Sequence, residues 1–497
     1  MFKKIVFSFL FLTFSLPLFS QFDYSDDCKK AYSLIVDLRF DSAKKYIEKV
    51  NTDHPENLIP LVLENYIDFL SIVLEEDKEL FEKLRYQKKN RVNKWEEGPK
   101  DSPYYRMGIA QMNMQWAFVR VLFGEYLTAA FEINQAYHLL EENKELYPDF
   151  LPNAMGLGIL HAMIGIVPDQ YQWAINFLGL YGSVDQGLGE LEALLDSDNP
   201  EFQHFKPEAL FLYTFLKLNL QSGEERYGEL KLRYQQKEMD LVSRHSPLLN
   251  FSRAVLLMKE DNDSVISFLE NRPVLGDALT FYYPEFMLGQ AKLYRLDADA
   301  YQLFDNYLKN YPGNNFKRSA AQKKAWSAFV QGDTLVYKQS MLKILYFPST
   351  QLDGDDAALK EAKKVSDGYL PNLYLLKSRI LFDGRYLKEA LAVFHNLDLS
   401  KFNKKEKIEL SYRKARIYHH LDSLDQALTF YQIALKEGEK FNSYFAANSC
   451  LKMGEIYEQK GINEKAKFYF EKCLDLDFEE YRRSIRAKAK AGLQHVK

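Results

Sequence analysis

Histidine and glutamate side chains one helical turn apart can hold a zinc ion and activate a water molecule, so the histidines are the first candidates for chemistry. The nearest pattern is His138-Leu139-Leu140-Glu141-Glu142, which lacks the second histidine of a His-Glu-x-x-His site. His419 and His420 are adjacent, so on a helix they point to different sides and cannot share one metal ion. We expect surface or interface roles for these histidines, and neither a metal site nor a catalytic residue.

His161 differs from the other histidines because it lies inside an apolar run at 156–167. A buried histidine usually finds one hydrogen-bond partner and keeps a structural role, which is the interpretation that we favour. The alternative is a surface for a partner or a lipid, formed by His161, Ile164, Trp173 and Phe177.

Other motifs that carry chemistry are incomplete. Gly156-Leu157-Gly158 is followed three residues later by His161 rather than glycine, and no predicted strand precedes it, so it does not fit a nucleotide-binding loop. The sequence contains no Gly-x-Ser-x-Gly nucleophile elbow. We expect no cofactor. A hydrolase whose residues meet only in the folded chain is the remaining catalytic alternative.

An acidic segment near residue 350 resembles the start of a calcium loop. Asp353, Asp355 and Asp356 alternate with a glycine, but the twelfth position is Lys364 rather than glutamate. We interpret the segment as a solvated acidic linker over 347–356.

Recurring small side chains predict the elements that carry these residues. In a two-helix repeat, a small residue on the first helix faces an alanine on the second, so that the axes approach to ~8–10 Å. A large apolar residue follows that alanine by one helical turn. The matching pairs, with a tyrosine on the same face in the last two copies, are Ala31/Ala43, Ala117/Ala129, Ser378/Ala390, Ala415/Ala427 with Tyr418, and Gly454/Ala466 with Tyr457.

Glycines between the paired helices agree with this pattern. Gly124, Gly384 and Gly461 lie just before a predicted second helix, where glycine can take the positive φ that ends a helix. No alternating strand pattern with two-residue hairpin turns is present. The sequence therefore predicts an all-α fold, a tetratricopeptide-like solenoid of helical hairpins that is irregular in its N-terminal half.

The repeat positions resemble the tetratricopeptide repeat family, closely over 401–494 and less closely over 32–55 and 116–136. The resemblance implies stacked helix pairs with a concave surface for a protein or peptide partner. On this basis we expect a scaffold or adaptor rather than an enzyme.

A second resemblance lies in the Gly-rich stretch Asn153-Ala154-Met155-Gly156-Leu157-Gly158 through Pro168, then 178–182 and 187–188. It looks like the core of the eukaryotic tetratricopeptide-39-like, inclusion-body-clearance family, whose later repeats resemble 371–377 and 381–386. Related exported proteins occur in Gram-negative bacteria. The resemblance implies a helical repeat fold and a link to lipid or aggregate handling, and it carries over no catalytic residue.

The segment 150–189 is an unusual apolar insert. Between Phe150 and Val184 the only charged residue is Asp169. We favour two buried helices joined at Pro168-Asp169 and packed closely through glycine. A lipid- or partner-binding surface and a re-entrant membrane hairpin are the alternatives, because each apolar piece is too short to span a bilayer.

The first twenty residues have the layout of a secretory signal peptide. Lys3 and Lys4 precede an apolar run at 5–14, Pro17 breaks the run, and Ser20 offers a small residue at a cleavage point. We expect export to the periplasm or outer envelope of a Gram-negative bacterium, with an uncleaved N-terminal anchor as the alternative.

The three cysteines are too few for a disulfide-built fold. Cys450 and Cys473 occupy facing positions of the last repeat, where we favour small apolar packing over a disulfide.

Charge and length bound the remaining possibilities. The chain has 497 residues and a net charge of −4 with both signs interspersed, which argues against a nucleic-acid partner. We expect a signal peptide at 1–20, an irregular repeat domain at 21–346, the linker at 347–356, and regular repeats at 357–497. The expected partners are a protein or peptide, with an envelope membrane or lipid as the alternative.

Overall fold

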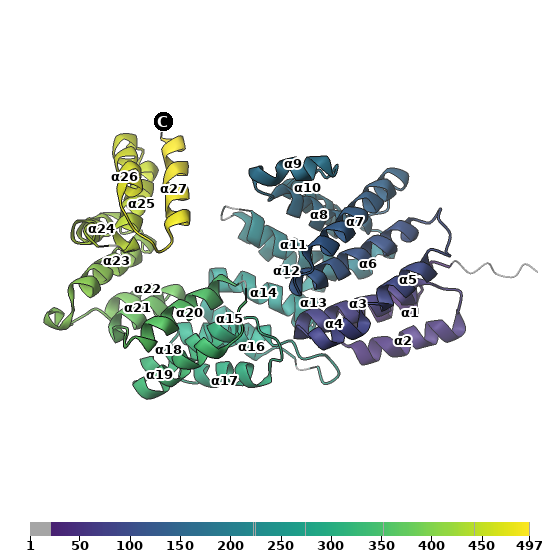
Figure 1. Cartoon of the computed structure of the whole chain (residues 1–497), viewed down its shortest axis with the longest axis horizontal. Helices are drawn as coiled ribbons and strands as arrows, with labels where there is room; N and C mark the ends of the chain where they lie inside the picture. The colour runs from purple at the N-terminus through teal and green to yellow at the C-terminus, as the bar shows by residue number, and fades with distance from the viewer. Residues whose placement is uncertain are drawn as a thin grey trace, which may run out of the picture. The chain divides into compact units, whose positions relative to one another are not determined.

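The computed structural model describes residues 21–221, 223, 225–273, 275–350, 352–441 and 443–496 (Figure 1). The proposed signal peptide, residues 1–20, lies outside these residues. Within the described residues the chain forms 27 α-helices and no strand. The prediction of an all-α fold of helical hairpins is therefore confirmed.

Contacts divide the chain into two compact units. The first runs to Leu256 and takes in Arg272–Phe281, and the second holds Leu257–Asn271 and everything from Tyr282 onward. The helices of the first unit are α1 (Asp26–Val36), α2 (Phe40–Asp53), α3 (Ile59–Glu75), α4 (Lys78–Leu84), α5 (Gln87–Trp95), α6 (Pro103–Leu122), α7 (Tyr126–Leu146), α8 (Asn153–Gly165), α9 (Gln172–Phe177), α10 (Val184–Asp196), α11 (Lys206–Leu220), α12 (Glu225–Gln235), α13 (Lys237–His245) and most of α14 (Pro247–Glu260), with short 3₁₀ turns at Asp169–Tyr171 and Pro200–Phe205.

The second unit continues the pattern of paired helices. Its elements are α15 (Asn262–Glu270), α16 (Tyr283–Tyr294), α17 (Ala300–Asn310), α18 (Lys317–Val330), α19 (Thr334–Lys343), α20 (Asp353–Ser366), α21 (Leu373–Asp383), α22 (Leu387–Ala392), α23 (Lys404–His420), α24 (Leu424–Gly438), α25 (Tyr444–Gln459), α26 (Asn463–Asp475) and α27 (Arg482–His495), with 3₁₀ turns at Ile344–Tyr346 and Leu399–Lys401.

The small side chains chosen for their spacing all lie between packed helices. Their exposed fractions do not exceed 2%, and Gly454 is buried as well; the others are Ala31, Ala43, Ala117, Ala129, Ser378, Ala390, Ala415, Ala427 and Ala466. The two tyrosines stack on the second helix of their own hairpin: Tyr418 lies 5.6 Å from Phe430 and Tyr457 lies 5.5 Å from Tyr469, with nearly parallel rings. Successive repeats thus share one register.

The turns follow the expectation at two of the three glycines. Gly124 and Gly461 have φ of +83° and +71°. In the third turn the left-handed residue is Arg385, with φ +65°, while Gly384 stays at −86°. Gly384 has a different reason to lack a side chain, because a Cβ there would lie 2.5 Å from the Cβ of Tyr294.

The acidic segment 347–356 takes part in the second unit. Asp353 begins α20, and Asp355 is fully buried. Its Oδ1 accepts a hydrogen bond from the Ser319 backbone N–H at 2.8 Å, and its Oδ2 accepts one from the Thr350 hydroxyl at 2.8 Å. A solvated linker is therefore the wrong description of Asp355. The division by contacts falls at Leu256, and the domain boundary at 347–356 stays a prediction.

All three cysteines are free thiols in the core. Burial raises the pKa of Cys473 to about 12 and raises the pKa of Cys450 as well. In the last hairpin, Cys450 and Cys473 pack as small apolar residues, as we favoured.

Candidate interaction surfaces

The Gly-rich segment begins with a close helix crossing in the first unit. A Cβ on Gly158 would lie 2.8 Å from the Gly187 carbonyl oxygen, and a Cβ on Gly187 would lie 2.3 Å from the Gly158 oxygen. Close packing through glycine is therefore present. It joins α8 to α10, however, and not to the second apolar piece at 173–181.

His161 is held inside this crossing, with 1% of its surface exposed. Its Nδ1 lies 2.8 Å from Glu190 Oε2, and its Nε2 lies 3.4 Å from Glu141 Oε1. Burial alone would raise the pKa of Glu190, but the hydrogen bonds from His161 and Lys144 hold it below its usual value of 4.5. The histidine thus has charged partners within the fold, which fits a structural role.

Ile164 belongs to the same interior. It is 8% exposed and packs in a cluster with Met114, Tyr137 and Leu160. His161 and Ile164 therefore do not form the partner or lipid surface that was the alternative, because the α8 face that carries them is covered by α7 and α10.

Trp173 and Phe177 lie on the outside, as the alternative of a binding surface requires, so the favoured interpretation of two buried helices is wrong for the second apolar piece. They are 72% and 85% exposed, and both belong to the short helix α9. Five further large side chains of this excursion are exposed by 41–64%: Met163, Ile166, Tyr171, Leu178 and Tyr181. We call these seven residues the apolar surface. Exposed apolar groups gathered in this way usually mark a binding site.

Helix α7 carries two further exposed apolar side chains in the first unit. Leu127 is 91% exposed and Phe131 is 69% exposed, one helical turn apart. Further along this face, the Nε2 of His138 lies 3.2 Å from the Leu178 carbonyl oxygen. The histidine of the incomplete zinc motif thus positions the chain that carries the apolar surface.

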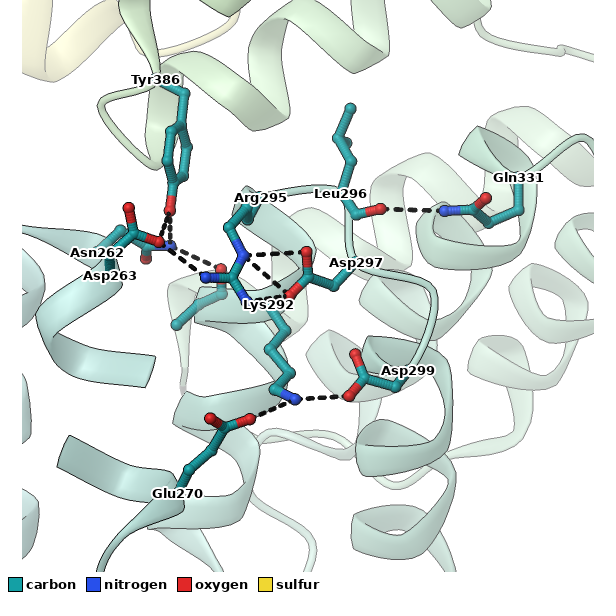
Figure 2. A network of polar contacts seen from close by, with 11 residues as sticks. Asn262, Asp263, Glu270, Lys292, Arg295, Leu296, Asp297, Asp299, Gln331 and Tyr386 are labelled. Atoms are coloured by element: carbon teal, nitrogen blue, oxygen red, sulfur yellow. Dashed lines mark hydrogen bonds and ion pairs between the residues drawn. The ribbon is translucent and has the colours of Figure 1, made fainter. Parts of the chain in front are cut away.

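A polar network connects α15, α16 and the turn before α22 in the second unit (Figure 2). Asn262 donates through Nδ2 to the Ala291 carbonyl at 2.8 Å and to the Tyr386 hydroxyl at 3.0 Å. That hydroxyl donates to Asp263 at 2.8 Å, and Arg295 binds the same carboxylate at 2.9 Å.

The network continues through the turn between α16 and α17. Arg295 also binds both oxygens of Asp297, and Lys292 lies 2.6 Å from Glu270 and 2.5 Å from Asp299. Because each cation already has carboxylate partners, this network fixes helices and leaves no charge free for a ligand. Residues so far apart in the sequence gave no signal of it.

A different set of side chains in the second unit comes from α18, α21, α23, α25 and the residue before α27. The guanidinium carbon of Arg379 lies 4.9 Å from the Trp326 ring centre. A line of tyrosines follows, with Tyr412 5.9 Å from Tyr444 and Tyr444 4.9 Å from Tyr481. We call these five residues, together with Arg416 on α23, the aromatic–cation face.

Electrostatic interactions connect the members of this face. Burial would lower the pKa of Arg379, but Asp383, Tyr444 and Tyr481 raise it. The Arg379 side chain stays 42% exposed and lies 3.8 Å from Asp383. Tyr481 is 60% exposed. Arg379 and Tyr481 thus reach solvent, whereas Trp326 and Tyr412 are buried. Exposed arginine and tyrosine side chains are common anchors in protein interfaces.

Sequence reasoning missed this face although a signal was present. Arg379 directly follows Ser378, and Arg416 directly follows Ala415, two of the small residues that define the repeats. On a helix, the residue after the small one points about 100° away from the hairpin interior. The residues that follow the small positions are therefore candidates for an outward face.

Two absences hold for the described part of the chain. No described helix has both the length and the apolar character needed to cross a bilayer. No group of three or more His, Cys, Asp or Glu side chains is placed to hold a metal ion among the described residues.

A comparison with known families matches part of the second unit. Residues 447–480 match the family model Tetratricopeptide repeat, which covers most of α25 and all of α26 and includes Gly454, Tyr457 and Ala466. No curated protein matches the sequence. Residues 447–480 are therefore similar to a tetratricopeptide repeat, and they lie within an all-α solenoid of helical hairpins.

Proposed function

We propose that the protein is an exported scaffold that binds a protein or peptide partner through the aromatic–cation face of its second unit. Tetratricopeptide repeats generally mediate binding to protein partners. The observation that carries the proposal is that Arg379, Arg416 and Tyr481 lie on the repeats and keep their side chains at least partly in solvent. Binding energy at interfaces concentrates in such residues.

Affinity capture from the native envelope tests the proposal. A photocrosslinking amino acid at position 481 should trap a partner, identified by mass spectrometry. Arg379→Ala should weaken the capture by tenfold or more. The matched control is Tyr86→Ala, which changes a tyrosine that is 74% exposed in the first unit. Equal capture by the Arg379 variant and the control would reject this face as the binding site.

Export is part of the proposal and is tested separately. A signal peptide at 1–20 would be removed, so the mature protein should begin at Gln21 or close to it. N-terminal sequencing of the protein from the cell envelope checks this, and an intact Met1 on cytoplasmic protein would contradict it.

A lipid-associated role is the second candidate, and the exposure of Trp173 and Phe177 favours it. Amphipathic rings and a lack of charge suit the interface of a bilayer. The resemblance of the Gly-rich stretch to the inclusion-body-clearance family fits the same role. Flotation with phosphatidylcholine vesicles should carry the wild type upward and lose the variant Trp173→Asp/Phe177→Asp. Tyr346→Asp, at a side chain 87% exposed in the second unit, is the control.

A further inference from the structure

Arg416 is an arginine without an acceptor. Its guanidinium carbon lies 4.2 Å from the ring centre of Phe382 and 5.9 Å from that of Tyr412. Among the described residues, none accepts a hydrogen bond from its five N–H groups, and no carboxylate lies within 4.0 Å. The neighbouring arginine on α23, Arg413, binds Glu409 instead. A guanidinium stacked on a ring keeps its N–H groups in its own plane, free for a partner at the edge.

Arg385 and His420 both lie close to Phe382: the Arg385 backbone N–H donates to the Phe382 carbonyl at 3.0 Å, and His420 contacts the ring. Arg385 occupies the left-handed turn between α21 and α22, is exposed, and has no carboxylate within 4.0 Å among the described residues. The His420 ring meets Phe382 edge-on at 5.0 Å between ring centres. Burial, then Arg416, His419 and Arg385, lower the pKa of His420 to about 4. The strongest charge effects on this imidazole therefore come from cationic groups.

Two carboxylates in the neighbourhood are already engaged. Glu455 lies 2.6 Å from Lys452, and Asp383 faces Arg379 at 3.8 Å. The site formed by Phe382, Arg385, Arg416 and His420 thus has two guanidinium groups with unused donors and an imidazole that is neutral at pH 7. This donor set matches a singly charged carboxylate, because a guanidinium edge binds both oxygens of a carboxylate at once.

We propose that Arg416 and Arg385, oriented by Phe382 and His420, bind a carboxylate side chain in an acidic segment of the partner protein. This inference rests on the proposed scaffold function and names the chemistry of its partner. Arg416 supplies the planar, pre-oriented contact, and Arg385 adds charge from the exposed turn. The ring of Phe382 shields one face of the pair from water, which strengthens a charge-assisted hydrogen bond.

Binding of two labelled peptides to the full chain tests the inference. The probe is a fluorescein-labelled 12-residue peptide in which Glu alternates with Ser, and its match has Gln at every Glu position. Fluorescence anisotropy should give at least tenfold tighter binding for the Glu peptide, with affinity that falls as salt rises. Equal binding of the two peptides, or binding of neither at millimolar concentration, would overturn the inference.

Variants of Arg416 distinguish binding at this site from a general attraction between charges. Arg416→Gln should weaken the Glu peptide tenfold or more, and Arg416→Lys should lose most of the binding although net charge is kept, since lysine cannot bind bidentately. The control Lys338→Gln removes one charge from α19 and should leave binding unchanged. Arg416 variants that behave like this control would refute the assignment, provided that circular dichroism shows them folded.

The same variants distinguish this inference from the proposed function. A partner that still crosslinks at position 481 in the Arg416→Gln protein leaves the scaffold function standing and removes the carboxylate site. A partner absent from both the wild type and the variant counts against the scaffold function, while the peptide measurements decide the carboxylate site alone.

Discussion

The ring of Phe470 is fixed between two glycines, which makes the last repeat sensitive to a single methyl group. A Cβ on Gly454 would lie 2.5 Å from Cε1 of this ring, and a Cβ on Gly492 would lie 2.5 Å from its Cζ. The ring is fully buried. Because both sides of the ring are occupied, it cannot move away from a methyl group added at Gly454.

Two effects of opposite sign decide the outcome of Gly454→Ala. Overpacking a core costs about 1–3 kcal/mol, while alanine is better than glycine inside a helix by about 1 kcal/mol. The repeat should therefore lose up to about 2 kcal/mol. The control is Gly189→Ala in α10, where an added Cβ meets nothing within 4 Å. That change should stabilise its helix by up to about 1 kcal/mol.

Native-state hydrogen exchange by mass spectrometry measures both changes where they occur, since repeat units can open locally without global unfolding. Peptides from 444–475 should exchange faster in Gly454→Ala, and peptides from 184–196 should exchange more slowly in Gly189→Ala. In a Phe470→Leu background, Gly454→Ala should cost less than it does alone. Slower exchange of 444–475 in Gly454→Ala would show that the ring does not confine this position.

Three further changes test other parts of the fold. Ala427→Leu, at a fully buried helix crossing, should cost about 1–3 kcal/mol in denaturant unfolding of the second unit. Burial lowers the pKa of His204 to about 4. The first unit should therefore be fully stable above pH 6.5, and its free energy of unfolding should fall by on the order of 3 kcal/mol as pH falls toward 4. His204→Phe should flatten this pH dependence. Phe177→Asp should change the free energy of unfolding by no more than about 0.5 kcal/mol, whereas Ile164→Asp should cost about 2–5 kcal/mol. Thermal melting at similar temperatures for the two variants would refute the placement of Phe177 outside the core and of Ile164 inside it.

The paired helices could be predicted because helix packing requires small side chains at regular spacings in the sequence. Two helix axes can approach only where both side chains are small, so pairs such as Ala415/Ala427 recur at a fixed offset. The stacked tyrosines Tyr418 and Tyr457 repeat for the same reason. No such spacing exists for surface side chains, because solvent places few constraints on them.

The apolar insert shows where this reasoning stops. Its low charge and many glycines suggested two helices packed together. In the structure, segments of this same composition form a buried helix α8 and an exposed helix α9. Periodicity cannot separate these cases in a six-residue helix. The site around Arg416 was hidden for another reason, since Arg416 and His420 meet Phe382 only after two hairpins have stacked.

The chain passes between its two units three times, at Leu256, at Asn271 and at Phe281. A fragment that begins at Tyr282 would therefore lack α15, and Lys292 and Tyr386 would lose the acceptors that Glu270 and Asp263 provide. Loss of activity in such a fragment would report a severed network rather than a missing partner site. Shortened forms for binding work should start no later than Leu257.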